Sequence, residues 1–482
     1  MNKQKKPAQD VRMPTGVRNL DAILCGGLPE RSVSVIGGSP GSGKSTLVGQ
    51  ICFHNASPQR KALIFQTLSE PTAKTLRYLQ QYSFFDRKKL NDGSVEFVDL
   101  GNIMRMKGLE LASAKILEHM KRVRPKIVVI DSFKVFSDLA GDRQELRKFA
   151  YEIAINLMAW ECTGFLLGEF TRTELQENPL SSIVDGIILM MAKEVFSEQR
   201  RFIQVAKMRG TDHARDEFPF VLNSDGAEIY APRITLKRTD NKETREQRKM
   251  TGIANLDKLL GSGIQVGSTI LISGVSGTGK TLLTLEMIYR GAKELNEKGI
   301  FFSFEETDAR LITAARGMGW DLEKEIKRGK IEIVSIPQSD IMLERDLLII
   351  NDCIIKLKAK RVAIDSVSVF MNKVADSVVA REKMYQLATI VQRAGAIGFF
   401  TTDIPYGSRR ISKFGVEETV VDGIILLTST EHGSKRERSL EIYKLRNTGH
   451  VDHRHTMCIG KGGITIFRRV PKNTKIVKEE SV

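Results

Sequence analysis

Cysteine is scarce in this 482-residue sequence, and long apolar runs are missing. The five cysteines, Cys25, Cys52, Cys162, Cys353 and Cys458, show no Cys-x-x-Cys spacing, which argues against a disulfide framework or a zinc site. No apolar run approaches the ~18 residues that a membrane span requires, and the first residues lack the apolar core of a signal peptide. We therefore expect a cytoplasmic protein without a membrane segment.

Acidic residues are outnumbered by basic ones, and the formal net charge is +16. Such an excess is typical of a surface for polyanions, or of a solvated basic surface that partly faces bound nucleotide. Much of the excess lies in the first six residues, in 233–249 and in 468–478, where no aromatic side chains interleave to stack on bases. Nucleic-acid binding is therefore compatible with the composition but is not the favoured interpretation.

One stretch, residues 38–45, matches the phosphate-binding pattern G-x-x-x-x-G-K-[ST]. A predicted strand precedes it and a predicted helix follows it. Glycines let successive N–H groups of such a loop converge on phosphate oxygens, and Lys44 would reach the β- and γ-phosphates. The pattern recurs at residues 274–281, again after a predicted strand, so we expect the chain to bind a nucleoside triphosphate twice. The predicted nucleotide-binding residues are Gly38, Ser39, Gly41, Ser42, Gly43, Lys44, Ser45, Thr46, Gly274, Ser276, Gly277, Thr278, Gly279, Lys280, Thr281 and Leu282.

The two loops belong to a long internal repeat. Lys44 and Lys280 lie 236 residues apart, and further landmarks recur at offsets between 234 and 237, which indicates tandem duplication of one domain. Within each copy, short β-branched strands alternate with helical patterns. This predicts an α/β fold in which each domain is a mostly parallel twisted sheet flanked by helices. The expected parts are a first domain at 11–231, a charged linker at 232–249, a second domain at 250–467 and a short basic tail at 468–482.

Two aspartates, Asp131 and Asp365, end apolar strands at matching places in the two copies. A carboxylate there can ligate Mg²⁺ together with the loop hydroxyl of Ser45 or Thr281. The alternative is an aspartate that only caps the following helix.

Glu305 and Glu306 end another predicted strand. A count without gaps from Asp321 and Asp86 pairs Glu305 with Glu70, so the first copy keeps one of two glutamates. We predict that Glu70, Glu305 and Glu306 are catalytic, because a carboxylate here can polarise an attacking water or hydroxyl. A glutamate that is only favoured by the dipole of a helix start is the alternative.

Two basic elements follow late strands, Lys207 with Arg209 and Lys444 with Arg446. These charges can reach the γ-phosphate of a neighbouring subunit, as an arginine finger does, and we predict a catalytic role for them. A basic hairpin on the surface is the alternative.

The two P-loops, the paired Ile-Asp-Ser strand ends, Glu305-Glu306 and the twice-repeated K-[ML]-R-[GN]-x-x-H element together resemble the KaiC family, over residues 11–467. The resemblance implies two tandem RecA-like P-loop NTPase domains in a double-ring homohexamer, with ATP and Mg²⁺ bound between subunits. It further implies slow ATP hydrolysis in the first domain and serine/threonine autokinase activity in the second, in circadian-type or stress regulation.

In that family the acceptors are an adjacent Ser-Thr pair before an Asp-x-Ile-Ile-Leu strand. Counting back from Asp422 places Glu418 and Thr419 there, so Thr419 is the predicted acceptor and Glu418 partly imitates a phosphoserine. Ser181 and Ser182 occupy the first copy's equivalent place, where ordinary helix-end serines are the favoured interpretation.

The resemblance leaves a KaiB-like partner open, whereas the short tail does not resemble the segment that binds KaiA. Two alternatives from other classes are a RecA- or RadA-like DNA-dependent ATPase and a scaffold that uses ATP only to assemble.

Overall fold

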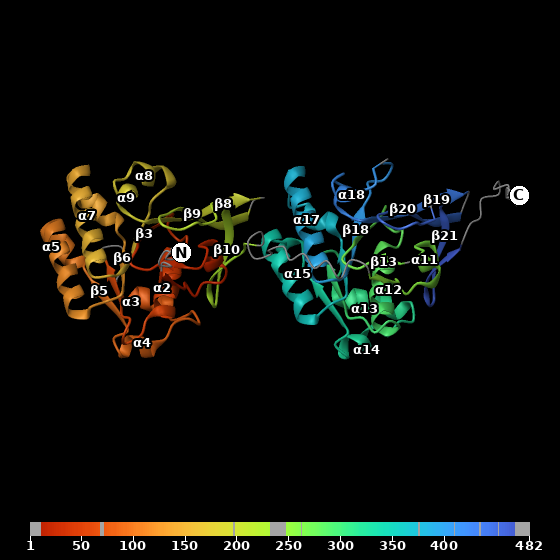
Figure 1. Ribbon diagram of the computed structural model, residues 1–482, viewed down its shortest axis with the longest axis horizontal. Helices are drawn as coiled ribbons and strands as arrows, with labels where there is room; N and C mark the ends of the chain where they lie inside the picture. Colours follow the sequence, from red (N-terminus) through yellow and green to blue (C-terminus); the bar gives the residue numbers. More distant parts are fainter. Residues whose placement is uncertain are drawn as a thin grey trace, which may run out of the picture. The chain divides into compact units, whose positions relative to one another are not determined.

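Each of the two phosphate-loop strands lies at the centre of its own nine-stranded sheet in the computed structural model (Figure 1). The chain divides into unit 1, residues 1–235, and unit 2, residues 236–482. The structure describes residues 11–467 except 68–71, 196–197, 232–246, 262, 375, 409, 433–434 and 452. Among these described residues, no helix combines the length and the apolarity that a membrane crossing requires.

The sheet of unit 1 has the strand order β11-β10-β9-β8-β3-β7-β6-β4-β5. The six strands from β8 to β5 in this order are parallel, and β9, β10 and β11 continue the sheet with antiparallel pairs. Because the carboxyl ends of parallel strands share one edge, this edge brings the ends of β3, β4, β6 and β7 together. The strands are β3 Val33–Gly38, β4 Ala62–Gln66, β5 Val95–Asp99, β6 Ile127–Asp131, β7 Thr163–Gly168, β8 Gly186–Val195, β9 Glu198–Met208, β10 Glu217–Asn223 and β11 Gly226–Ile229.

Helices cover both faces of this sheet (Figure 1). Successive side chains of β3 enter different cores: Ile36 packs with the helix that follows the loop, α2, whereas Val35 packs with α5 and α7. A strand that is buried on both faces needs apolar residues without alternation, which is the pattern of β3 and β6. The helices are α1 Leu20–Ile23, α2 Lys44–Asn55, α3 Thr72–Leu79, α4 Arg87–Asn91, α5 Gly101–Val123, α6 Lys134–Leu139, α7 Arg143–Ala159, α8 Arg172–Glu177 and α9 Leu180–Ile183.

Unit 2 repeats this topology, with the order β16-β15-β17-β18-β14-β19-β20-β21-β22. Its loop strand β14 lies between two parallel neighbours, β18 and β19. The strands are β14 Thr269–Gly274, β15 Gly299–Ser303, β16 Ile331–Ser335, β17 Arg361–Asp365, β18 Ile397–Asp403, β19 Gly423–His432, β20 Lys435–Leu445, β21 His455–Gly460 and β22 Gly463–Phe467. The helices are α11 Ala254–Leu259, α12 Lys280–Lys293, α13 Asp308–Gly317, α14 Leu322–Lys327, the 3₁₀ turn η2 Gln338–Asp340, α15 Leu343–Leu357, α16 Val367–Met371, α17 Ser377–Arg393 and α18 Glu417–Val420.

The predicted fold class is confirmed, because both sheets are mostly parallel and flanked by helices. Each unit also begins with a two-residue strand: β1, Arg12–Met13, pairs with β2, Leu28–Pro29, and β12, Arg248–Lys249, pairs with β13, Ile264–Gln265. The sequence analysis placed Arg248 and Lys249 in the linker. They pair with β13 because each repeat opens with this short strand. Two charged residues do not resemble a strand in the sequence, so the prediction assigned them to the linker.

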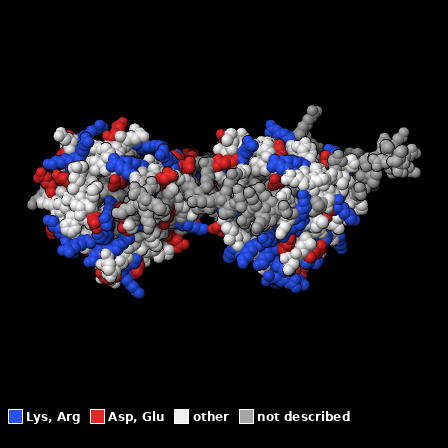
Figure 2. Space-filling model, viewed as in Figure 1, with Lys and Arg blue, Asp and Glu red and all other residues white. Residues whose placement is uncertain are grey.

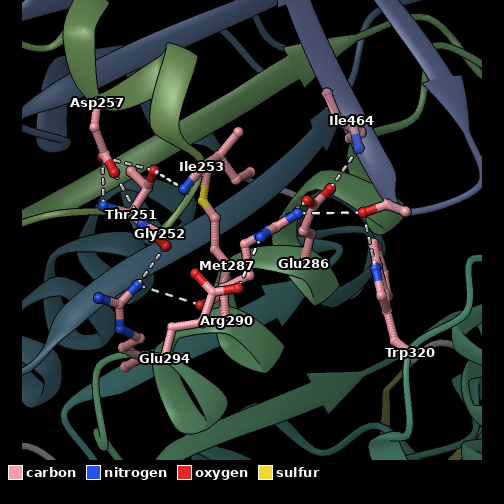
Figure 3. Close-up of polar contacts among 12 residues, drawn as sticks. Thr251, Gly252, Ile253, Asp257, Glu286, Met287, Arg290, Glu294, Trp320 and Ile464 are labelled. Atoms are coloured by element: carbon pink, nitrogen blue, oxygen red, sulfur yellow. Dashed lines mark hydrogen bonds and ion pairs between the residues drawn. The ribbon is translucent and has the colours of Figure 1, made fainter.

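Unit 2 also buries charged side chains on helix α12, which follows the P-loop, and on the neighbouring strand β17 (Figure 3). Glu286, which is fully buried, accepts hydrogen bonds from the Ile464 amide at 2.7 Å and from Arg290 Nε at 2.6 Å. Arg361, also fully buried, donates to the carbonyls of Thr251 at 2.9 Å and Met287 at 3.2 Å. These contacts join α12 to β22, to β17 and to the start of the unit.

Arg361→Ala is expected to lower the free energy of unfolding of unit 2 by about 3–5 kcal/mol, because breaking a buried ion pair leaves its other polar groups without a partner. Arg361 Nε lies 2.7 Å from Glu297 Oε2, and Glu297 is only 15% exposed. The matched control is Arg316→Ala, whose exposed pair with Glu323 should contribute less than about 1 kcal/mol. Denaturant unfolding of the full chain measures both, and equal shifts would contradict this account.

Candidate nucleotide-binding sites

The P-loop of unit 1 turns into α2 at Gly43, which has a φ of 100° and caps the helix. A Cβ atom at this position would meet the Leu222 side chain at 2.8 Å, so both the backbone conformation and the space require glycine. Lys44 Nζ donates to the carbonyls of Gly38 and Ser39, at 2.9 Å each. The loop therefore leaves the first amides of α2 to face an anion, and its lysine lies beside them.

A cavity of about 600 Å³ opens over this loop. It brings together a predicted residue of the first turn of α2 and one at the end of β6, because the Ser45 hydroxyl donates to Asp131 Oδ2 at 2.6 Å. Burial lowers the pKa of Lys44, while the carboxylates of Glu169 and then Asp131 act in the opposite direction. The lining residues are Pro40, Gly41, Gly43, Lys44, Ser45, Thr46, Gln66, Thr75, Tyr78, Gln81, Tyr82, Asp131, Ser132, Lys134, Val135, Asp138, Glu169 and Leu222.

The P-loop of unit 2 has the same geometry with one addition. Gly279, with a φ of 101°, caps α12, and Lys280 Nζ donates to the carbonyls of Gly274 at 2.9 Å and Val275 at 3.2 Å. Lys280 Nζ also lies 2.8 Å from Asp403 Oδ1. All three N–H groups of this ammonium therefore have an acceptor.

Asp365 lies at the end of β17, where the sequence analysis placed a Mg²⁺ ligand. Burial raises its pKa to about 6; the hydroxyls of Thr401 and Thr281 oppose the shift, and Glu305 and Glu306 add to it. Thr401 donates a short hydrogen bond to Oδ1, whereas Oδ2 is buried without a hydrogen-bond partner of good geometry. A buried carboxylate oxygen without a well-aligned donor fits a hard cation such as Mg²⁺, with the Thr281 hydroxyl next to it.

The glutamate pair of unit 2 lies at the same edge of the sheet. Glu305 is exposed, and its Oε1 accepts a hydrogen bond from the Ser366 hydroxyl at 2.6 Å. The Glu306 amide donates to the Ser303 hydroxyl at 2.9 Å. Both glutamates raise the pKa of Asp365, so their charges act on the predicted metal ligand.

Glu70, the predicted counterpart in unit 1, lies outside the described residues, so its role stays a prediction. Its pairing with Glu305 depends on the residue from which the count starts: counted from Asp86 and Asp321, Glu305 pairs with Glu70, and counted from Gln66 and Ser303, it pairs with Leu68. Gln66 and Ser303 occupy equivalent places, since each is paired with the strand-end aspartate of its unit. From there to Asp86 unit 1 has two residues more than unit 2 has to Asp321.

Sequence reasoning missed two acidic residues next to the loop lysines. Glu169 directly follows β7 and lines the cavity of unit 1, and Asp403 ends β18 and pairs with Lys280. Their position at the end of a strand is the feature that could have identified them, because β7 and β18 are each hydrogen-bonded to the strand that precedes the P-loop. An acidic residue at the carboxyl end of that neighbouring strand must lie close to the loop.

The basic elements Lys207/Arg209 and Lys444/Arg446 contact short helices instead of a P-loop of their own unit. Lys207 Nζ donates to the carbonyls of Ser181 and Val184 at 2.7 Å each, and Lys444 Nζ donates to those of Glu418 at 3.0 Å and Val421 at 2.9 Å. Arg209 lies 4.0 Å from Asp185, and Arg446 lies 3.7 Å from Asp422. Burial lowers the pKa of both lysines. These side chains hold the carbonyl ends of α9 and α18.

The predicted acceptor Thr419 lies on α18. Its side chain is exposed, and Oγ1 donates to the Val416 carbonyl at 2.7 Å. Glu418 is half-buried and accepts a short hydrogen bond from the Ser412 hydroxyl. In unit 1, Ser181 and Ser182 donate to backbone carbonyls of Asn178 and Pro179, as helix-end serines commonly do.

The repeated P-loop geometry can be compared with known proteins. The family model described as "ATPase: KaiC" matches twice, at residues 13–234 and 249–470. The chain belongs to the KaiC family. It is therefore a KaiC-family ATPase with tandem domains, as the sequence predicted.

Curated KaiC proteins resemble the chain over nearly its whole length. The circadian clock protein KaiC3 of Synechocystis sp. is 28% identical over 476 residues, which cover 93% of this chain and 92% of that protein. The circadian clock oscillator protein KaiC of Picosynechococcus sp. is 26% identical, over 96% of this chain and 90% of that protein. The oscillator protein KaiC of Parathermosynechococcus lividus is 26% identical, over 94% and 84% respectively.

Proposed function

We propose that this KaiC-family ATPase is a cytoplasmic serine/threonine autokinase that phosphorylates Thr419 with the γ-phosphate of ATP bound at unit 2. The observation that carries the proposal is the hydrogen bond of 2.6 Å between Glu305 and Ser366, the residue after the predicted metal ligand Asp365, together with the effect of Glu305 and Glu306 on the pKa of Asp365. Unit 1 would bind ATP for assembly and slow hydrolysis.

In this proposal the residues of unit 2 have separate tasks. Lys280 would bind the β- and γ-phosphates, and Asp365 and Thr281 would hold Mg²⁺, which neutralises charge on the phosphates when bound. Glu305 would accept the proton of the Thr419 hydroxyl as its Oγ1 attacks the γ-phosphorus. The new P–O bond forms, the bond to the bridging oxygen breaks, and ADP leaves. Lys444 and Arg446 would fix α18 and hence the place of Thr419.

The acceptor would come from a neighbouring copy in a ring, for which we propose the double-ring homohexamer of the family. In such a ring the basic residues that contact α9 and α18 of their own unit would also reach a phosphate that a neighbour binds; these residues are Lys207, Arg209, Lys444 and Arg446. We further propose a KaiB-like partner and no KaiA partner, in a circadian-type or stress-related pathway.

Thr419→Ala is expected to remove nearly all radiolabel that the protein takes up from γ-labelled ATP, because no other hydroxyl would occupy the acceptor position. The matched control is the double variant Ser181→Ala, Ser182→Ala, which should label as the wild type does. Labelling of Thr419→Ala at the wild-type rate would refute the assignment.

A DNA-dependent ATPase is the second candidate, because the net charge is +16. Figure 2 shows Lys and Arg interspersed with Asp and Glu over the visible face, whereas a nucleic-acid surface commonly gathers basic residues in a stripe. Stimulation of ATP hydrolysis by single-stranded DNA, with steep salt dependence, would favour this candidate.

A further inference from the structure

We infer that Ser366 and Ser368 are positioning residues of unit 2, whose hydroxyls connect Glu305 to the end of β18 beside Lys280. The inference rests on the proposed function, because it takes Glu305 as the proton acceptor. Three hydrogen bonds form the connection. Ser366 Oγ lies 2.6 Å from Glu305 Oε1, Ser368 Oγ lies 2.9 Å from Ser366 Oγ, and the Asp403 amide nitrogen lies 3.3 Å from Ser368 Oγ.

The direction of these bonds follows from the two ends. The Asp403 amide can only donate, so Ser368 Oγ accepts from it, and an ionised Glu305 can only accept, so Ser366 donates its single hydroxyl proton to Glu305. The remaining bond must then run from the Ser368 hydroxyl to Ser366 Oγ. Each hydroxyl therefore donates to one acceptor, Ser366 to Glu305 and Ser368 to Ser366, and this fixes the orientation of both side chains.

Burial makes this chain costly to break. Ser366 is 1% exposed and Ser368 is fully buried, so water does not replace a lost partner. Glu305 is exposed apart from this contact, and the Ser366 hydroxyl is what holds its carboxylate on the side of Asp365. An exposed glutamate without such a bond would sample several rotamers.

The other end of the chain lies beside the phosphate site. Lys280 has no spare N–H group, because Gly274, Val275 and Asp403 accept all three. An incoming phosphate oxygen must replace one acceptor. The two carbonyls belong to the P-loop, whereas the Asp403 carboxylate is 39% exposed and can turn away. The Asp403 backbone stays bonded to Ser368 meanwhile, so Glu305 keeps its place when ATP arrives.

In unit 1 the position equivalent to Ser368 carries no hydroxyl. Ser132 follows Asp131 as Ser366 follows Asp365, but the residue two positions later is Lys134 instead of serine. Lys134 Nζ lies 3.0 Å from Glu174, and its amide donates to Ser132 Oγ at 3.3 Å. Among the described residues, the link that Ser368 provides is therefore found in the unit for which we propose phosphotransfer and not at the matching position of unit 1.

The test uses the full chain with Lys44→Ala, so that turnover comes from unit 2. Ser368→Ala is expected to lower kcat for ATP hydrolysis and for labelling about 10-fold, and Ser366→Ala about 100-fold, since a positioned base contributes ~10²–10⁴. KM, and the Kd of a non-hydrolysable ATP analogue, should stay within about twofold. Because Ser366 also caps α16, Ser366→Thr, which keeps the hydroxyl and the cap, should restore most of the rate.

Unchanged hydrolysis in both alanine variants would overturn the inference, and so would a loss of analogue binding in parallel with kcat, since that would indicate a merely structural role. Absence of label on Thr419 in the wild type would instead refute the proposed function. The inference would then still be decided by hydrolysis, in which Glu305 orients a water.

Discussion

Lys280→Ala is expected to reduce phosphate transfer to Thr419 by about 10²–10³-fold, the cost typical of removing one group that stabilises charge in a transition state. Lys280 is buried at the start of α12, and no other lysine or arginine of the described residues is paired with Asp403. Its loss would leave the phosphates without their closest cation and Asp403 as a nearby negative charge. Initial rates of labelling from γ-labelled ATP measure the effect.

Lys44→Ala is the matched control, because Lys44 has the same contacts with its own loop carbonyls in unit 1. It should retain most label transfer while it loses the share of ATP hydrolysis that unit 1 contributes. Sedimentation of both variants with ATP checks that they assemble equally. Equal loss of labelling in two equally assembled variants would contradict the division of tasks between the units.

Asp365→Asn is expected to stabilise the nucleotide-free protein while it abolishes turnover at unit 2. Burial raises the pKa of Asp365 from an ordinary 3.8 to about 6, so folding disfavours the ionised form. At pH 7 that ionised form costs roughly 1–3 kcal/mol of stability, and the cost disappears as the pH falls through 6 toward 4. Asparagine removes the charge and keeps an oxygen to accept from Thr401.

Thermal unfolding in EDTA at pH 7 and pH 5 measures this trade-off. The wild type should gain stability at pH 5 relative to Asp365→Asn, and the difference between the two proteins should shrink. Asp131→Asn is the control, because Asp131 is only half-buried and accepts from Ser45, so its neutralisation should add less than about 1 kcal/mol. If Asp365→Asn is instead less stable than the wild type at pH 7, the ionised Asp365 carboxylate does not destabilise the metal-free fold, and this account is wrong.

The sequence was sufficient to predict the duplicated fold, because each feature involved acts locally. The P-loop pattern has a fixed spacing, β3 and β6 are continuous apolar runs, and Asp131 and Asp365 end their strands as expected. The KaiC family follows from the combination of these motifs, and the family match bears it out.

The remaining parts depend on contacts between residues far apart in the chain. Glu169 and Asp403 belong to no spaced motif, and only the strand order places them beside Lys44 and Lys280. Arg361 begins a buried strand, where the apolar pattern would predict an apolar residue. Its buried charge is stabilised by the Thr251 carbonyl and the Glu297 carboxylate, which are distant in the sequence. The pairing of Glu70 with Glu305 stays a prediction, because unit 1 has two residues more than unit 2 between these strand ends and the helix caps Asp86 and Asp321, and a sequence count does not locate them.

Peptide mapping by mass spectrometry after incubation with ATP tests the central claim most directly. A time course on the full chain, digested and searched for phosphopeptides, should place the phosphate on Thr419, with the Lys280→Ala protein unmodified at the same times. Phosphate on Ser181 or Ser182 with Thr419 unmodified, or no phosphopeptide while ATP is hydrolysed, would contradict an autokinase in unit 2.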